Sequence, residues 1–142
     1  MKTIFFALIG AVLSITAAFA EPVKMPADVV LASAAEGEVL LIDIRTPDEW
    51  DQSGVAAPAH LIDMQNKGFV RDLKALMAAH PGKPVAMICA TGARSGFVTK
   101  RLAEYGFTGL IDVSEGMYGS AAGPGWLKRG LPVRKSAEPP TR

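Results

Sequence analysis

Three short, mainly apolar runs set the strongest limit on the fold: residues 39–42, 84–88 and 110–113, the last of which contains one charged residue, Asp112. A strand that is apolar at every position, rather than at every second one, is buried on both of its faces. Between these runs, apolar side chains recur at helical spacing, as at Phe69 and Leu73. Buried strands that alternate with helices predict an α/β fold, with a central parallel β-sheet and helices on both faces.

The limits of the other elements follow from helix start and stop signals. Thr46 and Glu49 form a capping box, and Pro47 occupies the first helical position, so a short helix begins there. We expect helices over residues 26–36, 47–52, 69–80 and 97–105, and a short strand at residues 60–62.

The chain has one cysteine, Cys89, placed where the run at residues 84–88 ends and a turn of small residues leads into a helix. Backbone N–H groups converge at the N-terminus of a helix, and such a site binds anions and favours a thiolate over a thiol. We therefore predict that Cys89 is a nucleophile and that the turn is its binding loop. The loop residues are Ala90, Thr91, Gly92, Ala93, Arg94 and Ser95.

Two charged residues follow the first apolar run in the same way. Asp43 comes directly after residues 39–42, as Cys89 comes after residues 84–88, and Arg45 follows two residues after Asp43. Ligands of parallel α/β sheets bind beyond the carboxyl ends of the strands, which meet at one edge. We therefore expect Asp43 and Arg45 on the same edge as Cys89, where the three form a candidate site.

Residues 1–20 have the pattern of a secretory signal peptide. Lys2 supplies the positive start, residues 4–18 are almost wholly apolar, and Ala18, Phe19 and Ala20 form a small-x-small cleavage site. An uncleaved membrane anchor is the alternative, but the run is at the short limit for a span and contains weakly hydrophobic residues. We expect cleavage near Ala20, a periplasmic or secreted protein, and no stable membrane anchor.

Length and composition limit the rest of the chain to one domain and argue against a nucleic-acid partner. Residues 21–133 are long enough for a single core, and the tail at residues 134–142 is polar and proline-rich, so we expect it to be disordered. The whole chain has 15 Lys and Arg against 14 Asp and Glu, without a basic run, so no nucleic-acid partner is expected. A single cysteine cannot form an internal disulfide. The sequence leaves the oligomeric state open.

Four motifs resemble those of the rhodanese family of sulfurtransferases in its single-domain form. Asp43, Arg45 and Glu49 are similar to the family's D-x-R-x-x-x-E signature, and residues 89–95 look like its C-x-x-G-x-R-S loop. Residues 115–117 and 130–133 look like its closing segments, so the resemblance spans about residues 25 to 133. It implies a rhodanese-like fold over the single domain.

The resemblance also implies a reaction. Cys89 would take a sulfane sulfur from a small donor such as thiosulfate or a persulfide, hold it as a persulfide, and pass it to cyanide or a thiol, including a protein thiol. This covalent route needs no metal and no other cofactor. Two alternatives stay open: a non-catalytic persulfide carrier or partner-binding module, and a cysteine phosphatase. The phosphatases of this fold have a C-x5-R loop, one residue longer than the loop from Cys89 to Arg94.

The supporting residues have more than one possible role. Arg94 either attracts an anionic donor or braces the loop by pairing with an acid, because its guanidinium stays charged and forms forked hydrogen bonds. The family pattern suggests an ion pair between Arg45 and Glu49, and a structural role for Asp43. The classical thiosulfate enzymes have basic residues directly after the cysteine, where this chain has Ala90 and Thr91. Residues 118–125 also form a longer stretch than is usual in the family.

The cleavage site leads to a first prediction. The isolated native protein is expected to begin at Glu21 and to be found in the soluble periplasmic fraction, because Ala20 fits the final position of the cleavage motif. N-terminal sequencing and intact mass of the native protein measure this. An intact Met1 in a membrane fraction would contradict it.

Overall fold

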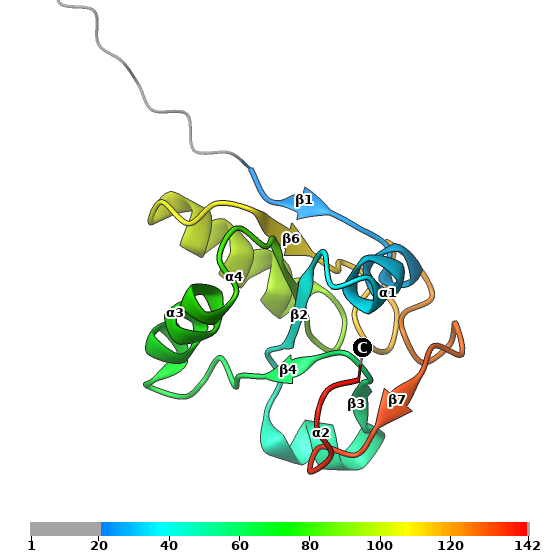
Figure 1. The fold of residues 1–142 in the computed structure, drawn as a ribbon. Helices are drawn as coiled ribbons and strands as arrows, with labels where there is room; N and C mark the ends of the chain where they lie inside the picture. Colours follow the sequence, from blue (N-terminus) through cyan, green and yellow to red (C-terminus); the bar gives the residue numbers. More distant parts are fainter. Residues whose placement is uncertain (1–20, 142) are drawn as a thin grey trace, which may run out of the picture.

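The computed structural model describes residues 21–141, which contain seven strands and four helices (Figure 1). Five strands form one parallel sheet in the order β1-β6-β5-β2-β4, and β3 and β7 form a separate antiparallel pair. In chain order the elements are β1 (Val23–Lys24), α1 (Ala27–Ala35), β2 (Leu40–Asp43), α2 (Pro47–Ser53), β3 (Val55–Ala56), β4 (His60–Leu61), α3 (Phe69–Ala79), β5 (Val85–Ile88), α4 (Ala93–Glu104), β6 (Leu110–Asp112) and β7 (Val133–Arg134).

The three apolar runs form the centre of the sheet, as predicted. Strands β2, β5 and β6 lie side by side and are parallel, and every residue in them is buried. Neighbouring residues along a strand point to opposite faces. Leu40 and Ile42 accordingly pack in one apolar cluster, whereas Leu41 packs in the other. Burial on both faces explains why these runs do not alternate with polar residues.

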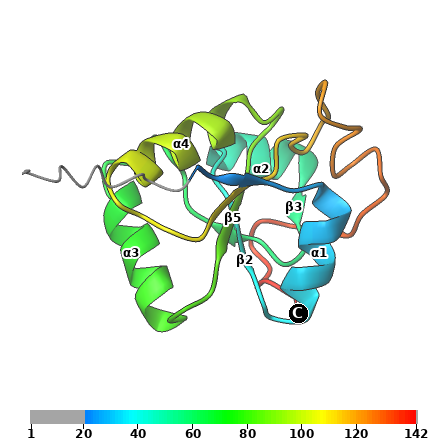
Figure 2. The same ribbon diagram turned by 90° about the horizontal axis from the view of Figure 1, so that it is seen from above.

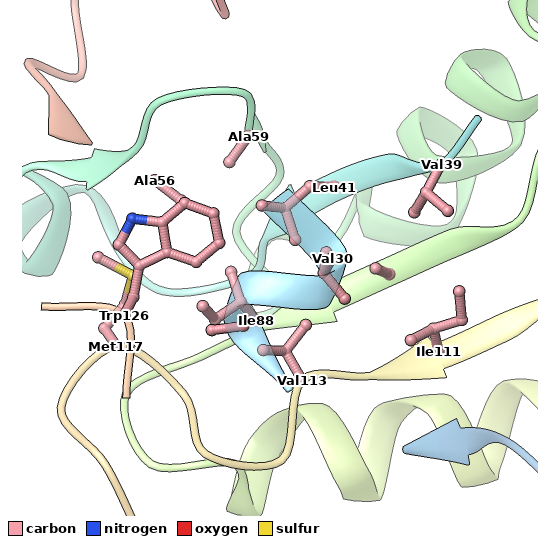
Figure 3. Packing of buried hydrophobic residues seen from close by; sticks show 12 residues of the cluster. Val30, Val39, Leu41, Ala56, Ala59, Ile88, Ile111, Val113, Met117 and Trp126 are labelled. Carbon is pink, nitrogen blue, oxygen red and sulfur yellow. The ribbon is translucent and has the colours of Figure 1, made fainter. Parts of the chain in front are cut away.

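Helices cover both faces of the sheet, so the predicted α/β class is confirmed. Helices α3 and α4 lie on one side of the central strands and α1 lies on the other (Figures 1 and 2). On the α1 side, the ring of Trp126 packs near Met117 and Ala56 (Figure 3), and its Nε1 donates to the Pro132 carbonyl oxygen at 2.9 Å. Trp126, which is fully buried, therefore brings the chain back into the core after the long loop at residues 118–125.

The capping box at the start of α2 forms as the sequence predicts. The Thr46 hydroxyl accepts a hydrogen bond from the Glu49 backbone N–H at 3.5 Å, and the Thr46 N–H donates to Glu49 Oε2 at 3.1 Å. Pro47 is the first helical residue. The carboxylate of Glu49 is therefore held at the N-terminal end of α2, beside the carboxyl edge of the sheet.

Helix α4 begins four residues before the predicted start at residue 97. Its first residue is Ala93, so Arg94 and Ser95 lie in its first turn rather than in an extended loop. The N-cap is Gly92, whose φ of +87° is in the left-handed region that glycine adopts without steric cost. This conformation turns the chain sharply after Cys89, and the helix starts at once.

The tail also differs from the disorder expected after residue 133. Strand β7 pairs with β3, and the buried Arg134 side chain donates to the carbonyl oxygens of Ala57 and Ala59. The Thr141 N–H donates to the Ala57 oxygen at 3.0 Å. The polar composition of the tail did not predict these contacts. A single arginine makes them, because its guanidinium can donate to several backbone oxygens at once.

The predicted signal peptide, residues 1–20, lies outside the described residues. Within residues 21–141, no helix combines the length and the apolar character that crossing a membrane requires.

Candidate active site

Cys89 follows β5 directly, at the carboxyl edge of the sheet, and its side chain is almost fully buried, with 1% exposed. Two loop amides donate to its sulfur: the N–H of Gly92, with N at 3.2 Å from Sγ, and the N–H of Ser95, with N at 3.4 Å. The Cys89 thiol in turn lies 3.5 Å from the Ser95 hydroxyl oxygen. The sulfur therefore lies in a cradle of donors, which stabilises negative charge on it.

The other loop residues shape the cradle with their backbone. Thr91 and Ala93 are exposed, and Ala90 is half-buried with its carbonyl oxygen accepting from the Tyr118 N–H at 2.9 Å. The N–H groups in the first turn of α4, including those of Ala93 and Arg94, have no acceptor within the helix. In an α-helix such N–H groups are directed towards the N-terminal end, which in α4 is the end at Gly92.

A second loop packs against the first so closely that two positions must be glycine. A Cβ atom added to Gly92 would lie 1.9 Å from the Ser114 carbonyl oxygen, and one added to Gly116 would lie 2.5 Å from the Ala90 oxygen. The Met117 N–H also donates to the Cys89 oxygen at 2.8 Å. The chain after β6 therefore holds the cysteine loop in place from one side.

Arg94 pairs with an acid of the chain, which is the arrangement that the bracing role requires. Its two terminal nitrogens donate to the two oxygens of Glu49, at 2.8 and 2.5 Å. This bidentate pair is the strongest geometry for an arginine and a carboxylate. The Arg94 guanidinium lowers the pKa of Glu49 to about 2. The guanidinium charge is thus matched by an acid of the chain and is directed at α2.

The predicted ion pair between Arg45 and Glu49 is wrong. Arg45 pairs with Asp43 instead, through three hydrogen bonds of 2.7 to 3.1 Å, and both side chains are fully buried. Arg45 reaches Glu49 only at its backbone oxygen, 3.3 Å away, and also donates to Ser53 and to the Gly54 oxygen. The Asp43–Arg45 pair therefore fixes the turn between β2 and α2, as the structural role predicted for Asp43 requires.

Two acidic residues at the site were missed from the sequence. Asp112, the last residue of β6, accepts a hydrogen bond from the Ser95 hydroxyl at 2.6 Å. The buried Glu115 carboxylate accepts from the N–H groups of Ala27 and Gly125 and from Arg129, which anchors the long loop at residues 118–125. Asp112 follows the apolar residues Leu110 and Ile111, much as Asp43 follows residues 39–42. This pattern could have identified Asp112 as a site residue from the sequence.

Metal ligands are not gathered in the part of the chain that the structure describes. Within residues 21–141, no group of three or more His, Cys, Asp and Glu side chains is arranged to hold an ion.

The fold and the site together define a single-domain α/β protein with a cysteine loop between β5, the middle strand of its parallel sheet, and α4. The family model of the rhodanese-like domain matches residues 26–122. The chain belongs to the rhodanese-like domain family.

Relatives in sequence are distant. Chloroplastic thiosulfate sulfurtransferase 16 of Arabidopsis thaliana is 32% identical over 100 residues, which span 66% of this chain and 78% of that protein. An uncharacterised protein of Rickettsia prowazekii is 27% identical over 101 residues, which span 65% of this chain and 80% of that protein.

Two solved structures share the fold. The polysulfide-sulfur transferase homodimer of Wolinella succinogenes has a TM-score of 0.62 and 29% identity, over 84% of this chain and 82% of that one. A protein of M. tuberculosis has a TM-score of 0.65 and 22% identity, over 82% of this chain and all of that one. At 22% identity, the likeness to the M. tuberculosis protein shows a shared fold and nothing more.

The contact between the two loops yields a prediction with a matched control. Gly92→Ala should lower the free energy of unfolding by about 3 kcal/mol or more, through left-handed strain and overpacking, and should slow alkylation of Cys89. Gly106→Ala has the same φ of +87° but no atom within 4 Å of the new Cβ, so it should cost only about 1–2 kcal/mol and leave alkylation unchanged. Urea unfolding and iodoacetamide kinetics measure both effects. Equal effects from the two variants would contradict the role of the Ser114 contact.

The Glu49–Arg94 pair yields a prediction about pH. The folded pKa of Glu49, about 2, lies below its usual value of 4.5, so the pair stabilises the protein above pH 4.5 and loses this effect as pH falls towards 2. Glu49→Gln should lower stability at pH 7 by about 1–2 kcal/mol, since the pair is partly open to solvent. The difference from wild type should shrink between pH 4.5 and 2.

Urea unfolding at pH 7, 4.5, 3 and 2 measures this change. Asp48→Asn, at an exposed neighbour in the first turn of α2, is the control and should lose little stability at any pH. A Glu49→Gln variant that loses stability with pH in parallel with wild type would contradict the assignment.

Proposed function

We propose that this protein is a sulfurtransferase that carries a sulfane sulfur on Cys89 as a persulfide and passes it to a thiol or to cyanide. The observation that carries the proposal is the cradle around Sγ, in which the amides of Gly92 and Ser95 stabilise an anionic sulfur. The names of two similar proteins, a thiosulfate sulfurtransferase and a polysulfide-sulfur transferase, support the same class of reaction.

The proposed reaction has two steps. The Cys89 thiolate attacks the sulfane sulfur of the donor, an S–S bond forms, and the donor's bond to that sulfur breaks with its electron pair leaving on sulfite or a thiolate. The acceptor then attacks the outer sulfur, and the Cys89 thiolate leaves. Covalent catalysis of this kind divides one transfer into two displacements on the same atom. We assign the first-turn N–H groups of Ala93 and Arg94 to the outer sulfur, because donors at a helix N-terminus favour an anion.

The charges at the loop favour a persulfide or polysulfide donor over thiosulfate. Ala90 and Thr91 place no cation after the cysteine, and the charge of Arg94 is matched by Glu49 at 2.5 Å. A dianion such as thiosulfate gains little electrostatic attraction at such a loop, whereas a hydropersulfide carries at most one charge. We therefore assign the sulfane sulfur of a persulfide or polysulfide as the preferred donor.

The same loop disfavours phosphatase chemistry. A phosphatase loop needs a guanidinium that is free to hold the phosphoryl oxygens, and both terminal nitrogens of Arg94 are bonded to Glu49. The loop is also one residue shorter than C-x5-R.

We further propose that the protein works outside the cytoplasm, after removal of residues 1–20. The support for this is the cleavage pattern at Ala18, Phe19 and Ala20. A lone thiol in an oxidising compartment that takes up sulfur and gives it to a thiol, including a protein thiol, fits the persulfide chemistry of Cys89.

Mass spectrometry tests the persulfide. Protein treated with polysulfide or thiosulfate should gain about 32 Da at Cys89 and lose it to cyanide, because the nucleophilic sulfur forms the covalent intermediate. Cys89→Ser should gain no mass and should transfer no sulfur, while its urea midpoint shows that it folds. Sulfur transfer by Cys89→Ser would contradict the proposal. Loading without rapid discharge to cyanide or a thiol would instead identify a persulfide carrier.

A further inference from the structure

A row of three buried side chains connects Cys89 to a carboxylate that the sulfur-transfer mechanism does not use. The Cys89 thiol lies 3.5 Å from the Ser95 hydroxyl oxygen, and that hydroxyl donates to Asp112 Oδ1 at 2.6 Å. The three residues come from three elements: the end of β5, the first turn of α4 and the end of β6. Cys89, Ser95 and Asp112 are 1%, 0% and 3% exposed.

The number of protons in this row links the charges at its two ends. A serine hydroxyl has one proton to donate and can accept as well. With a Cys89 thiol and an Asp112 carboxylate, the S–H donates to Ser95 and the Ser95 O–H donates to Asp112. With a Cys89 thiolate and a protonated Asp112, each bond reverses its direction. Both arrangements satisfy all three groups, whereas two anions would compete for the single Ser95 proton.

We propose that Asp112 accepts the proton of the Cys89 thiol through the Ser95 hydroxyl, so that the thiolate forms without releasing a proton to solvent. The S–H proton moves to the Ser95 oxygen while the Ser95 proton moves to Asp112, and the S–H electron pair stays on sulfur. The total charge of the row does not change. This inference rests on the proposed function, since the thiolate is the attacking group there. Asp112 acts through Ser95 and is a positioning residue and proton acceptor.

The surroundings of Asp112 suit it to this role. It lines a cleft of about 500 Å³ together with three other charged residues, Glu21, Lys24 and Lys100. Lys24 lies opposite it in the β1–β6 register. Burial raises the pKa of Asp112 above its usual value, against the opposing effects of the Ser95 hydrogen bond and the Lys24 charge. A carboxylate with a raised pKa is a better proton acceptor, and the cleft lets it exchange that proton with water.

Alkylation of the chain's single cysteine tests the proposal without any sulfur donor. The rate of reaction with iodoacetamide, measured from pH 4.5 to 9.5, should rise in two steps in the wild type, one for each end of the coupled pair. Asp112→Asn keeps an oxygen that can accept from Ser95 but cannot take the proton. It should show one step only, and should react about 10- to 100-fold more slowly at pH 6.

Asp63→Asn removes a carboxylate beyond β4 that has no contact with the row, and its profile should match the wild type. An Asp112→Asn variant that reacts at pH 6 as fast as the wild type, or faster, would overturn the proposal. A faster reaction is what simple removal of a negative charge near the thiolate predicts.

A second variant keeps the test independent of any damage to the fold at Asp112. Lys24 is exposed, and Lys24→Met removes the positive charge that lowers the pKa of Asp112, so the lower step should move to higher pH. An unmoved lower step would count against the assignment. A two-step profile in a protein that never gains sulfur mass would support the proton transfer to Asp112 and contradict the proposed function. Sulfur loading with identical wild-type and Asp112→Asn profiles would support the proposed function and contradict the proton transfer.

Discussion

The bidentate pair between Glu49 and Arg94 is the interaction on which the site depends, because it joins two segments that lie 45 residues apart in the chain. The Glu49 carboxylate also closes the capping box with Thr46, so one side chain fixes both the start of α2 and the end of the cysteine loop. The buried Asp43–Arg45 pair stabilises the turn between β2 and α2. The cradle around Cys89 therefore keeps its shape through interactions made by a neighbouring strand-to-helix turn.

Much of the fold could be predicted from local patterns. The mainly apolar runs identified β2, β5 and β6, because a strand buried on both faces consists largely of apolar residues. The capping box identified α2 because its residues are adjacent in sequence. The start of α4 was missed, since small residues favour loops, and only the left-handed Gly92 and its contact with Ser114 show that the helix begins at Ala93.

The side-chain pairs of the site were harder to predict than its backbone. Cys89 and its loop could be placed from one segment, but the acid that pairs with each arginine depends on distances between segments. Arg45 was assigned to Glu49, four residues away, and instead pairs with Asp43. The buried Arg134 could not be anticipated at all, because its partners are backbone oxygens of Ala57 and Ala59, which leave no mark in the sequence.

The docked tail has a consequence for how the domain can be tethered. Pro140 and Thr141 line a hollow with Gly37 and Lys83, which precede β2 and β5, so the end of the chain lies at the amino ends of the strands. Cys89 lies at the carboxyl ends (Figure 2 shows the end of the chain on the side away from the start of α4). A support or fusion partner joined after Thr141 would therefore lie on the side of the sheet away from the Cys89 loop.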